Sequence, residues 1–202
     1  MTAPEQSHGT RSRPPRRNVA ALTQKRLETA AAAYVARFDA SSSQLRAVLM
    51  RRVRTAQRAA VPIVAAAEAV IDGIIARYTK AGVLDDTRYA ERKAGSLHRR
   101  GVSSRHIREK LKRAGIDRDG VDQALETTRE ELAADGHELD LRAALAFARR
   151  RRLGPFRTTG DRDERRSRDL AALGRAGFAL DIARQVIDAD DPDALLADGP
   201  PP

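Results

Sequence analysis

The chain has 202 residues, of which 41% are hydrophobic, so it can bury several small cores, and this excludes disorder throughout. It has no cysteine, which excludes disulfides, thiol nucleophiles and cysteine-ligated metal and is typical of a reducing compartment. The formal net charge of +10 favours a polyanionic partner, either a phosphate backbone or an acidic protein surface. A solvated basic surface without a partner is the alternative.

The first 18 residues contain four arginines and three prolines and lack periodic apolar positions. They predict a disordered basic tail over residues 1–18. No apolar segment follows these arginines, and no stretch of the chain approaches the roughly 18 uncharged apolar residues that a membrane span requires. We therefore expect a cytoplasmic protein without a membrane segment.

Residues 19–82 are predicted to form a first, divergent three-helix repeat, because apolar residues recur there every three or four positions. The run Val61-Pro62-Ile63-Val64 is the only β-branched one. Its proline and the alanines that follow predict the start of a helix from about Ile63 to Ala81 instead of a strand.

Residues 83–136 give the clearest three-helix repeat. Each predicted helix begins after a residue that can cap its N-terminus, and a glycine follows the first two helices. The capping candidates are Asp85 or Asp86, Ser103 or Ser104, and Asp117, and the glycines are Gly101 and Gly115. The third helix is predicted to end at about Ala134.

Residues 137–188 are predicted to form a third repeat with a polar insertion near residues 154–163. Such an exposed insertion is either a binding loop or a tolerated spacer. Residues 189–202 are acidic and rich in proline, which predicts a flexible C-terminal tail.

An internal repeat links these units. Lys80-Ala81-Gly82-Val83, Arg113-Ala114-Gly115-Ile116 and Arg175-Ala176-Gly177-Phe178 each place a cation, alanine, glycine and an apolar residue at a predicted helix end. Glycine can adopt the left-handed conformation there, the apolar residue can pack on the last turn, and the cation complements the helix dipole.

A constant offset of 62 residues relates Gly115 to Gly177 and Ser41-Ser42 to Ser103-Ser104. A unit of three short helices is too small to bury its apolar faces alone. We therefore predict an all-α protein of tandem three-helix repeats, stacked into an elongated, curved array.

The residues that usually carry catalysis are poorly represented. There is no glycine-rich phosphate loop, and the acid pairs lie at a helix start or on a charged helix face. The histidines show no metal-binding spacing and are interpreted as surface residues; they are His8, His98, His106 and His137. We assign no catalytic residue, no metal and no cofactor, and expect a protein that is not an enzyme.

Basic faces are better represented. On the helix predicted from Ser104, the residues Arg105, Arg108 and Lys112 fall opposite the apolar stripe of Ile107 and Leu111. The neighbouring carboxylate of Glu109 can pair with Arg105 or Arg113 and partly neutralise this ridge. An ordinary salt-bridged helix face is the alternative interpretation.

The run Arg149-Arg150-Arg151-Arg152 is the densest cluster, and Arg99 with Arg100 forms a smaller one. Four consecutive cations repel one another unless an anion lies nearby, so the run favours an anionic partner. No aromatic pair is placed by its spacing to stack on bases, which favours backbone phosphates or an acidic groove over base edges.

The segment G-V-L-D-D-T-R-Y-A, from Gly82 to Ala90, is followed by Arg99-Arg100-Gly101. This order resembles the central motif of the RecX family, G-x-L-D-D-x-R-[YF]-A followed by R-x-G. Leu153-Gly154-Pro155-Phe156 resembles the family motif more weakly, and the resemblance covers roughly residues 23–188.

The resemblance implies a curved, repeat-built monomer that lodges in the groove of the RecA nucleoprotein filament. It also implies restraint of strand exchange and of ATP hydrolysis by the recombinase, through blocked filament growth or filament destabilisation, without hydrolysis by the regulator itself. We expect the basic faces to meet acidic protomer surfaces and filament phosphate; they comprise Arg99, Arg100, Arg105, Arg108, Lys112, Arg149, Arg150, Arg151 and Arg152.

Two other hypotheses remain open. A three-helix unit with a basic second helix is similar to a helix-turn-helix module that binds single- or double-stranded DNA directly. Its ridge offers Arg and Lys but little Asn or Gln, so sequence-specific recognition would be weak. The other hypothesis is a structural scaffold whose charge is incidental.

Overall fold

The computed structural model describes residues 20–192 and 194–196. Within them, nine α-helices and two short 3-10 helices form the secondary structure, and the only strand-like feature is an isolated bridge between Leu22 and Ile63. The prediction of an all-α protein is confirmed. The predicted N-terminal tail, residues 1–18, lies outside the described residues, as do residues 193 and 197–202 of the predicted C-terminal tail.

The helices form three successive groups of three. The first group is α1 (Gln24–Val35), α2 (Ser42–Arg58) and α3 (Ala67–Lys80). The second group is α4 (Asp86–Arg99), α5 (Ser104–Arg113) and α6 (Arg118–Glu131). The third group is α7 (Gly136–Arg151), α8 (Arg162–Arg175) and α9 (Leu180–Asp188), with the 3-10 turns Gly154–Phe156 and Ala194–Leu196.

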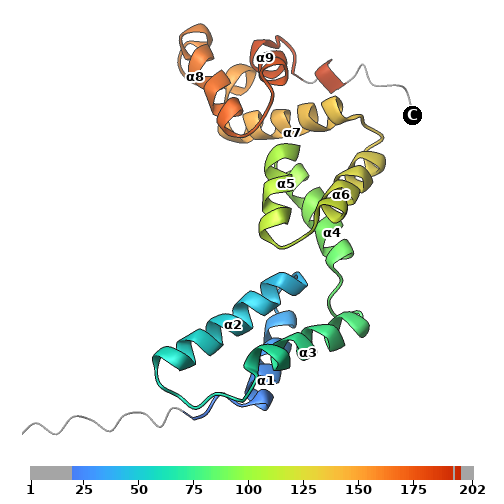
Figure 1. The fold of residues 1–202 in the computed structure, drawn as a ribbon. Helices are drawn as coiled ribbons and strands as arrows, with labels where there is room; N and C mark the ends of the chain where they lie inside the picture. Colours follow the sequence, from blue (N-terminus) through green and yellow to red (C-terminus); the bar gives the residue numbers. More distant parts are fainter. Residues whose placement is uncertain (1–19, 193, 197–202) are drawn as a thin grey trace, which may run out of the picture.

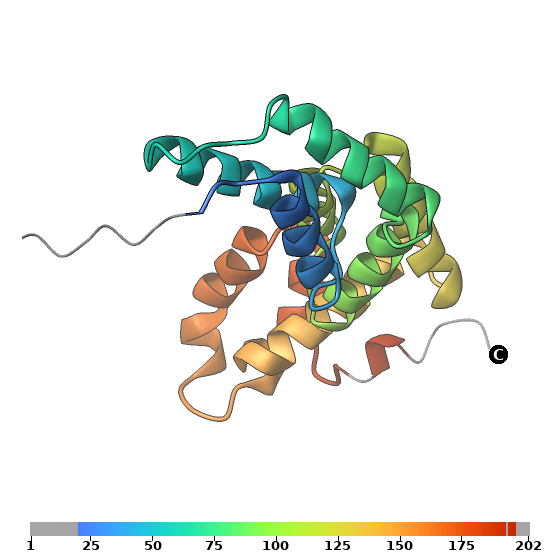
Figure 2. The same ribbon diagram turned by 90° about the horizontal axis from the view of Figure 1, so that it is seen from below.

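The groups follow one another from the bottom to the top of Figure 1. Seen from below, they partly overlap, so the array extends mainly along one direction (Figure 2). Each group has its own cluster of buried apolar side chains. The arrangement is that of tandem three-helix units.

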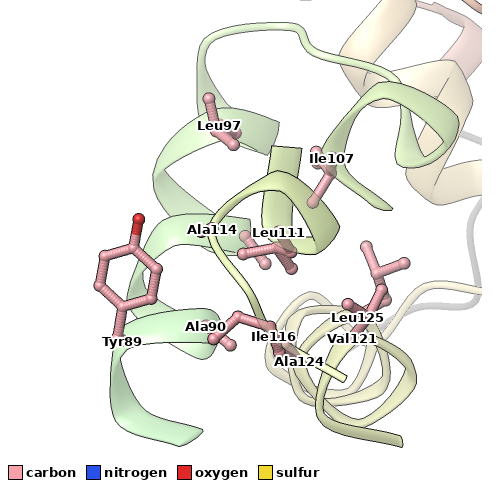
Figure 3. Close-up of a cluster of buried hydrophobic side chains, with 11 residues drawn as sticks. Tyr89, Ala90, Leu97, Ile107, Leu111, Ala114, Ile116, Val121, Ala124 and Leu125 are labelled. Atoms are coloured by element: carbon pink, nitrogen blue, oxygen red, sulfur yellow. The ribbon is translucent and has the colours of Figure 1, made fainter. Parts of the chain in front are cut away.

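The core of the second group shows how short side chains bring these helices together. Figure 3 shows side chains of α4, α5 and α6 meeting in one cluster, with Tyr89 at its edge. Ala90, Ala94 and Ala124 are completely buried, so the backbones of α4 and α6 can approach closely. Ile107 and Leu111 are completely buried as well, and each stabilises the fold by about 1.5–3 kcal/mol.

Helix starts follow the predicted capping chemistry. The side chains of Asp85, Ser103 and Asp117 accept hydrogen bonds from backbone N–H groups in the first turns of α4, α5 and α6. The alternatives Asp86 and Ser104 have another role, because both take part in contacts between groups. A capping side chain satisfies an N–H group that has no partner inside the helix.

Helix ends also follow the prediction, with one exception. Gly82, Gly115 and Gly177 have φ values of +68°, +81° and +86°, where glycine avoids the strain of a Cβ atom. Ile116 and Phe178 pack back into the cores, whereas Val83 is 53% exposed, so its predicted packing was wrong.

The three Ala-Gly turns all end helices but do not occupy equivalent places in their groups. The turns at Gly115 and Gly177 join the second and third helices of a group. The turn at Gly82 instead joins the first group to the second. The same four-residue pattern serves both places because it reports only how a helix ends.

The segment from Val61 to Val64 is extended, so the predicted helix start at Ile63 was wrong and α3 begins at Ala67. The Leu22 N–H donates to the Pro62 carbonyl at 2.8 Å, and the Val64 N–H donates to the Leu22 carbonyl at 3.0 Å. Proline has no N–H group, but here only its carbonyl is needed.

The first part of the predicted polar insertion is not exposed. Gly154 is buried, and its N–H donates to the Asp169 carboxylate at 2.9 Å. The Arg157 guanidinium pairs with Asp169 at 2.7 Å, and the Asp169 side chain is only 2% exposed. The turn from Gly154 to Arg157 is thus a structural part of the third group, and the exposed residues of the predicted insertion are Thr158 to Asp161 and Asp163.

Candidate functional site

The contacts between groups recur, and those made by the serine hydroxyls repeat with the predicted offset of 62 residues. The Ser41 hydroxyl donates to the Ala114 carbonyl, and the Ser103 hydroxyl donates to the Ala176 carbonyl at 2.7 Å. The N–H groups of the next residues donate to Asp86 and Asp140 at 2.8 Å each, from Ser42 and Ser104. We call the junction of the first and second groups joint 1 and that of the second and third groups joint 2.

Glycine is required at these joints for space as well as for conformation. A Cβ atom on Gly115 would lie 2.2 Å from the Ser43 side chain, and one on Gly177 would lie 2.6 Å from the Ser103 hydroxyl. Each joint therefore fixes the N-terminus of one middle helix against the C-terminus of the next. This explains why the serine pair and the Ala-Gly pair recur at one spacing.

Joint 2 has further contacts that bury a histidine. His98 is 5% exposed, and its Nε2 lies 2.7 Å from the Leu139 carbonyl, so its interpretation as a surface residue was wrong. Gly101 lies against the α7 backbone, where a Cβ atom would come within 2.5 Å of the Phe147 nitrogen. A histidine followed three residues later by glycine at a helix end could have signalled this contact.

Two predicted basic clusters meet at joint 2. The Arg150 guanidinium donates to the Arg100 carbonyl, which brings the end of α4 to the end of α7. All four members of the α7 arginine cluster, Arg149 to Arg152, are exposed. Arg152 ends the helix in a left-handed conformation with φ of +55°.

Aromatic rings lie beside these arginines. The guanidinium carbons of Arg150 and Arg151 each lie 5.8 Å from the centre of the Phe147 ring, and that of Arg149 lies 5.2 Å from the centre of the Phe156 ring. The negative faces of the rings offset part of the repulsion between the cations. The cluster stays exposed and able to meet an anion.

The α5 ridge, formed by Arg105, Arg108 and Lys112, is also exposed and lies opposite the buried Ile107 and Leu111, as its spacing predicts. The ridge has an ion pair with another helix, which the residues of α5 alone did not predict. Arg108 forms an ion pair with Asp122 of α6, and this hydrogen bond lowers the pKa of the Asp122 carboxyl.

Glu109 lies 3.9 Å from Arg105 and 3.6 Å from Arg113, as predicted. Asp122 and Glu109 together offset part of the positive charge of the α5 ridge. Arg99 and Arg100 are exposed at the end of α4. The structure thus joins Arg100 to the α7 cluster and holds Arg108 toward α6.

A cavity of about 510 Å³ opens at joint 2. Its lining residues are His106, Phe147, Arg151, Leu153, Ala172, Arg175 and Ala176. Of these, only Arg151 was predicted as a site residue. The sequence carried no signal for Arg175, because the 62-residue offset aligns Ala176 with Ala114 and only the structure shows that Ala176 contacts Ser103.

The cavity also lies near a ring pair. The Phe147 and Phe178 ring centres are 5.9 Å apart, although 31 positions separate the two residues. No local spacing in the sequence reveals such a pair. Phe178 belongs to the core, whereas Phe147 is half-buried and reaches the cavity.

The described residues contain neither a cluster of potential metal ligands nor a membrane-spanning helix. In residues 20–192 and 194–196, no three His, Asp or Glu side chains lie together as potential metal ligands. No helix in the same part of the chain is long and apolar enough to cross a membrane. The basic surfaces and the cavity at joint 2 are therefore the candidate site.

Comparison with known proteins adds a family. The family model for the second three-helix domain of RecX matches residues 85–125, which span α4, α5 and most of α6. A protein named "Regulatory protein RecX" from Myxococcus xanthus is 40% identical over 165 residues, which cover 81% of this chain and 85% of that protein.

A protein of the same name from Agrobacterium fabrum is 34% identical over 119 residues, covering 58% of this chain and 59% of that protein. A third, from Trichlorobacter lovleyi, is 31% identical over 116 residues, covering 56% of this chain and 70% of that protein. No solved structure gives a significant match.

Proposed function

The chain belongs to the RecX family, and from this membership we propose that it is a non-enzymatic regulator that binds the RecA nucleoprotein filament. In this proposal it inhibits the recombinase and ATPase activities of RecA in the cytoplasm. It thereby modulates DNA recombination and repair, including repair during the SOS response. The observation that carries the proposal is the 40% identity to a RecX regulator over most of both chains.

The exposed basic surface supports this proposal physically. The α7 arginine cluster and Arg100 gather on one side of joint 2, and they can meet filament phosphate or acidic protomer surfaces. Guanidinium groups bind carboxylate and phosphate through paired hydrogen bonds, which suits a mixed protein and DNA surface.

The array offers a reason why such a regulator can act on a filament. Joint 2 is held by hydrogen bonds, so the α5 ridge and the α7 arginine cluster keep a defined separation. An elongated monomer with two basic surfaces can contact more than one point along a filament groove. By restraining neighbouring RecA protomers, it would then hinder both growth of the filament and ATP hydrolysis by RecA.

The test is the rate of single-strand-dependent ATP hydrolysis by the host recombinase, titrated with this protein at low and high salt. We expect inhibition at substoichiometric protein, weakened by salt because the contacts are ionic. Binding to the same DNA alone is the control. Unchanged hydrolysis together with tight binding to bare DNA would contradict the proposal.

That result would favour direct DNA binding by a helix-turn-helix-like unit. The exposure of the α5 ridge, in particular of Arg105, supports this second candidate. The pairing of Arg108 with Asp122 weakens it, because a paired guanidinium is less available to a base edge or phosphate.

A further inference from the structure

The two joints share the same backbone hydrogen bonds, but the side chains packed in them differ. Asp86 and Asp140 accept the same backbone hydrogen bond, and the buried alanines that follow, Ala90 and Ala94, correspond to Ala144 and Ala148. Three residues after these aspartates stand Tyr89 in α4 and Ala143 in α7. Joint 1 thus has a phenol ring at the position where joint 2 has only a methyl group.

Tyr89 is 3% exposed at joint 1. Burial raises the pKa of its hydroxyl, against the effect of a hydrogen bond with Gln44. His106 holds the position at joint 2 that Gln44 holds at joint 1, because each follows its capping serine by three residues. At joint 2, His106 lines the cavity of about 510 Å³.

The cavity combines an apolar floor with a basic rim. Phe147, Leu153 and Ala172 provide apolar surface, and none of its lining residues is acidic. Arg151 and Arg175 form no ion pair with a carboxylate within the described residues, unlike Arg157 and Arg166, which do. Two guanidinium groups without a counter-charge among the described residues therefore border the cavity at joint 2.

We infer that this cavity binds one nucleotide of single-stranded DNA, with the base against Phe147 and Arg151 and the phosphate on Arg175. This inference rests on the proposed function, in which the partner filament carries single-stranded DNA. Unpaired bases stack on aromatic rings and on guanidinium planes, whereas a base inside a duplex cannot reach such a cavity.

Size and charge favour a nucleotide over an acidic side chain. The cavity volume falls within the roughly 300–1,000 Å³ of small-molecule sites. A carboxylate would occupy one guanidinium and leave the apolar floor uncovered. Arg150 and Arg152, next to the rim, can contact the neighbouring phosphates of a strand.

The first test fills the cavity. Ala172 lines it, whereas the adjacent Ala171 is exposed and does not, so Ala172→Trp and Ala171→Trp are a matched pair on one helix. Binding of a fluorescein-labelled oligothymidylate is measured by fluorescence anisotropy. We expect Ala172→Trp to weaken binding about fivefold or more and Ala171→Trp to leave it unchanged. Circular dichroism verifies that both variants remain helical.

The second test separates this cavity from general charge. Arg175→Gln and Arg168→Gln remove the same charge from α8, but only Arg175 borders the cavity. We expect the larger loss of binding with Arg175→Gln. An oligonucleotide containing 5-iododeoxyuridine should also crosslink to Phe147 on irradiation, as identified by mass spectrometry, and Ala172→Trp should prevent it.

Absence of oligonucleotide binding by the unmodified protein, or equal binding by the two tryptophan variants, would overturn the inference. Loss of affinity for DNA-free recombinase with Ala172→Trp, without loss of oligonucleotide binding, would assign the cavity to a protein side chain instead. If oligonucleotide binding depends on the cavity but RecA hydrolysis is not inhibited, the proposed function fails and this inference stands.

Discussion

The second and third helical groups share one plan but stabilise the turn between their first two helices differently. In the second group this turn contains Gly101 and packs on the α7 backbone of the next group. In the third group the turn from Gly154 to Arg157 is held from within by Asp169. An internal ion pair therefore holds in the third group the turn that a contact with the next group holds in the second.

The largest expected effect comes from removing that internal ion pair. Asp169→Ala would leave the Arg157 guanidinium, 19% exposed, without a counter-charge and the Gly154 N–H without an acceptor. Breaking a buried pair from one side costs about 3–5 kcal/mol. Urea unfolding monitored by circular dichroism measures this loss.

The matched control is Asp122→Ala, which removes the ion pair between α5 and α6 in the second group. Both side chains of that pair are almost half exposed, so solvent screens their interaction. We expect a much smaller loss. If the two variants lost equal stability, the internal ion pair would not be what stabilises the third group.

A second comparison concerns glycines with and without a neighbouring group. Gly82 and Gly177 both have positive φ, but a Cβ atom on Gly82 meets nothing within 4 Å, whereas one on Gly177 meets Ser103. Gly82→Ala should cost about 1–2 kcal/mol for the backbone conformation alone. Gly177→Ala should cost more, because Ser103 must also move and joint 2 weakens. Equal unfolding midpoints in urea would contradict the role of Gly177 in the joint.

The sequence was sufficient to predict what is local and periodic. Caps such as Asp85 and stops such as Gly115 act within a few residues, so their chemistry appears in the sequence itself. It was not sufficient where distant segments meet. The burial of His98 against Leu139, the role of Asp169 and the pairing of Leu22 with Pro62 depend on packing between elements.

The candidate site shows the same division. The exposed α5 ridge could be predicted because its helix has an apolar stripe that fixes the opposite face. The cavity at joint 2 could not, because its lining residues come from α5, from α7 and the segment after it, and from α8, which meet only in the folded chain.

The two basic surfaces can be compared directly by neutralisation. Changing Arg149, Arg150, Arg151 and Arg152 to glutamine should weaken filament binding about tenfold, or about 1.4 kcal/mol, because four exposed guanidinium groups are lost together, whereas Asp122 and Glu109 already pair with cations of the α5 ridge. Neutralising Arg105, Arg108 and Lys112 should have a smaller effect. Co-sedimentation with the filament at two salt concentrations measures both. A larger effect of the α5 variant would reverse the assignment.

The smallest expected effect is a dependence of the stability of the fold on pH, which the second and third helical groups share. The Arg108 guanidinium lowers the pKa of Asp122, and the Arg166 guanidinium lowers the pKa of Asp188, each pair joining the second and third helices of its group. Because both folded pKa values lie below the ordinary 3.8, these pairs stabilise the fold above that pH.

Their contribution is lost as the pH falls through the lowered folded values. Asp122→Asn and Asp188→Asn should therefore lower the thermal midpoint at neutral pH and approach the unmodified protein in acid. Thermal unfolding followed across this range tests the expectation. A difference that persisted at low pH would mean that shape or hydrogen bonding, and not the charge of these carboxylates, links the helices. Since the same pairing occurs in both groups, the acid response should be nearly equal, in contrast to the response to Asp169→Ala.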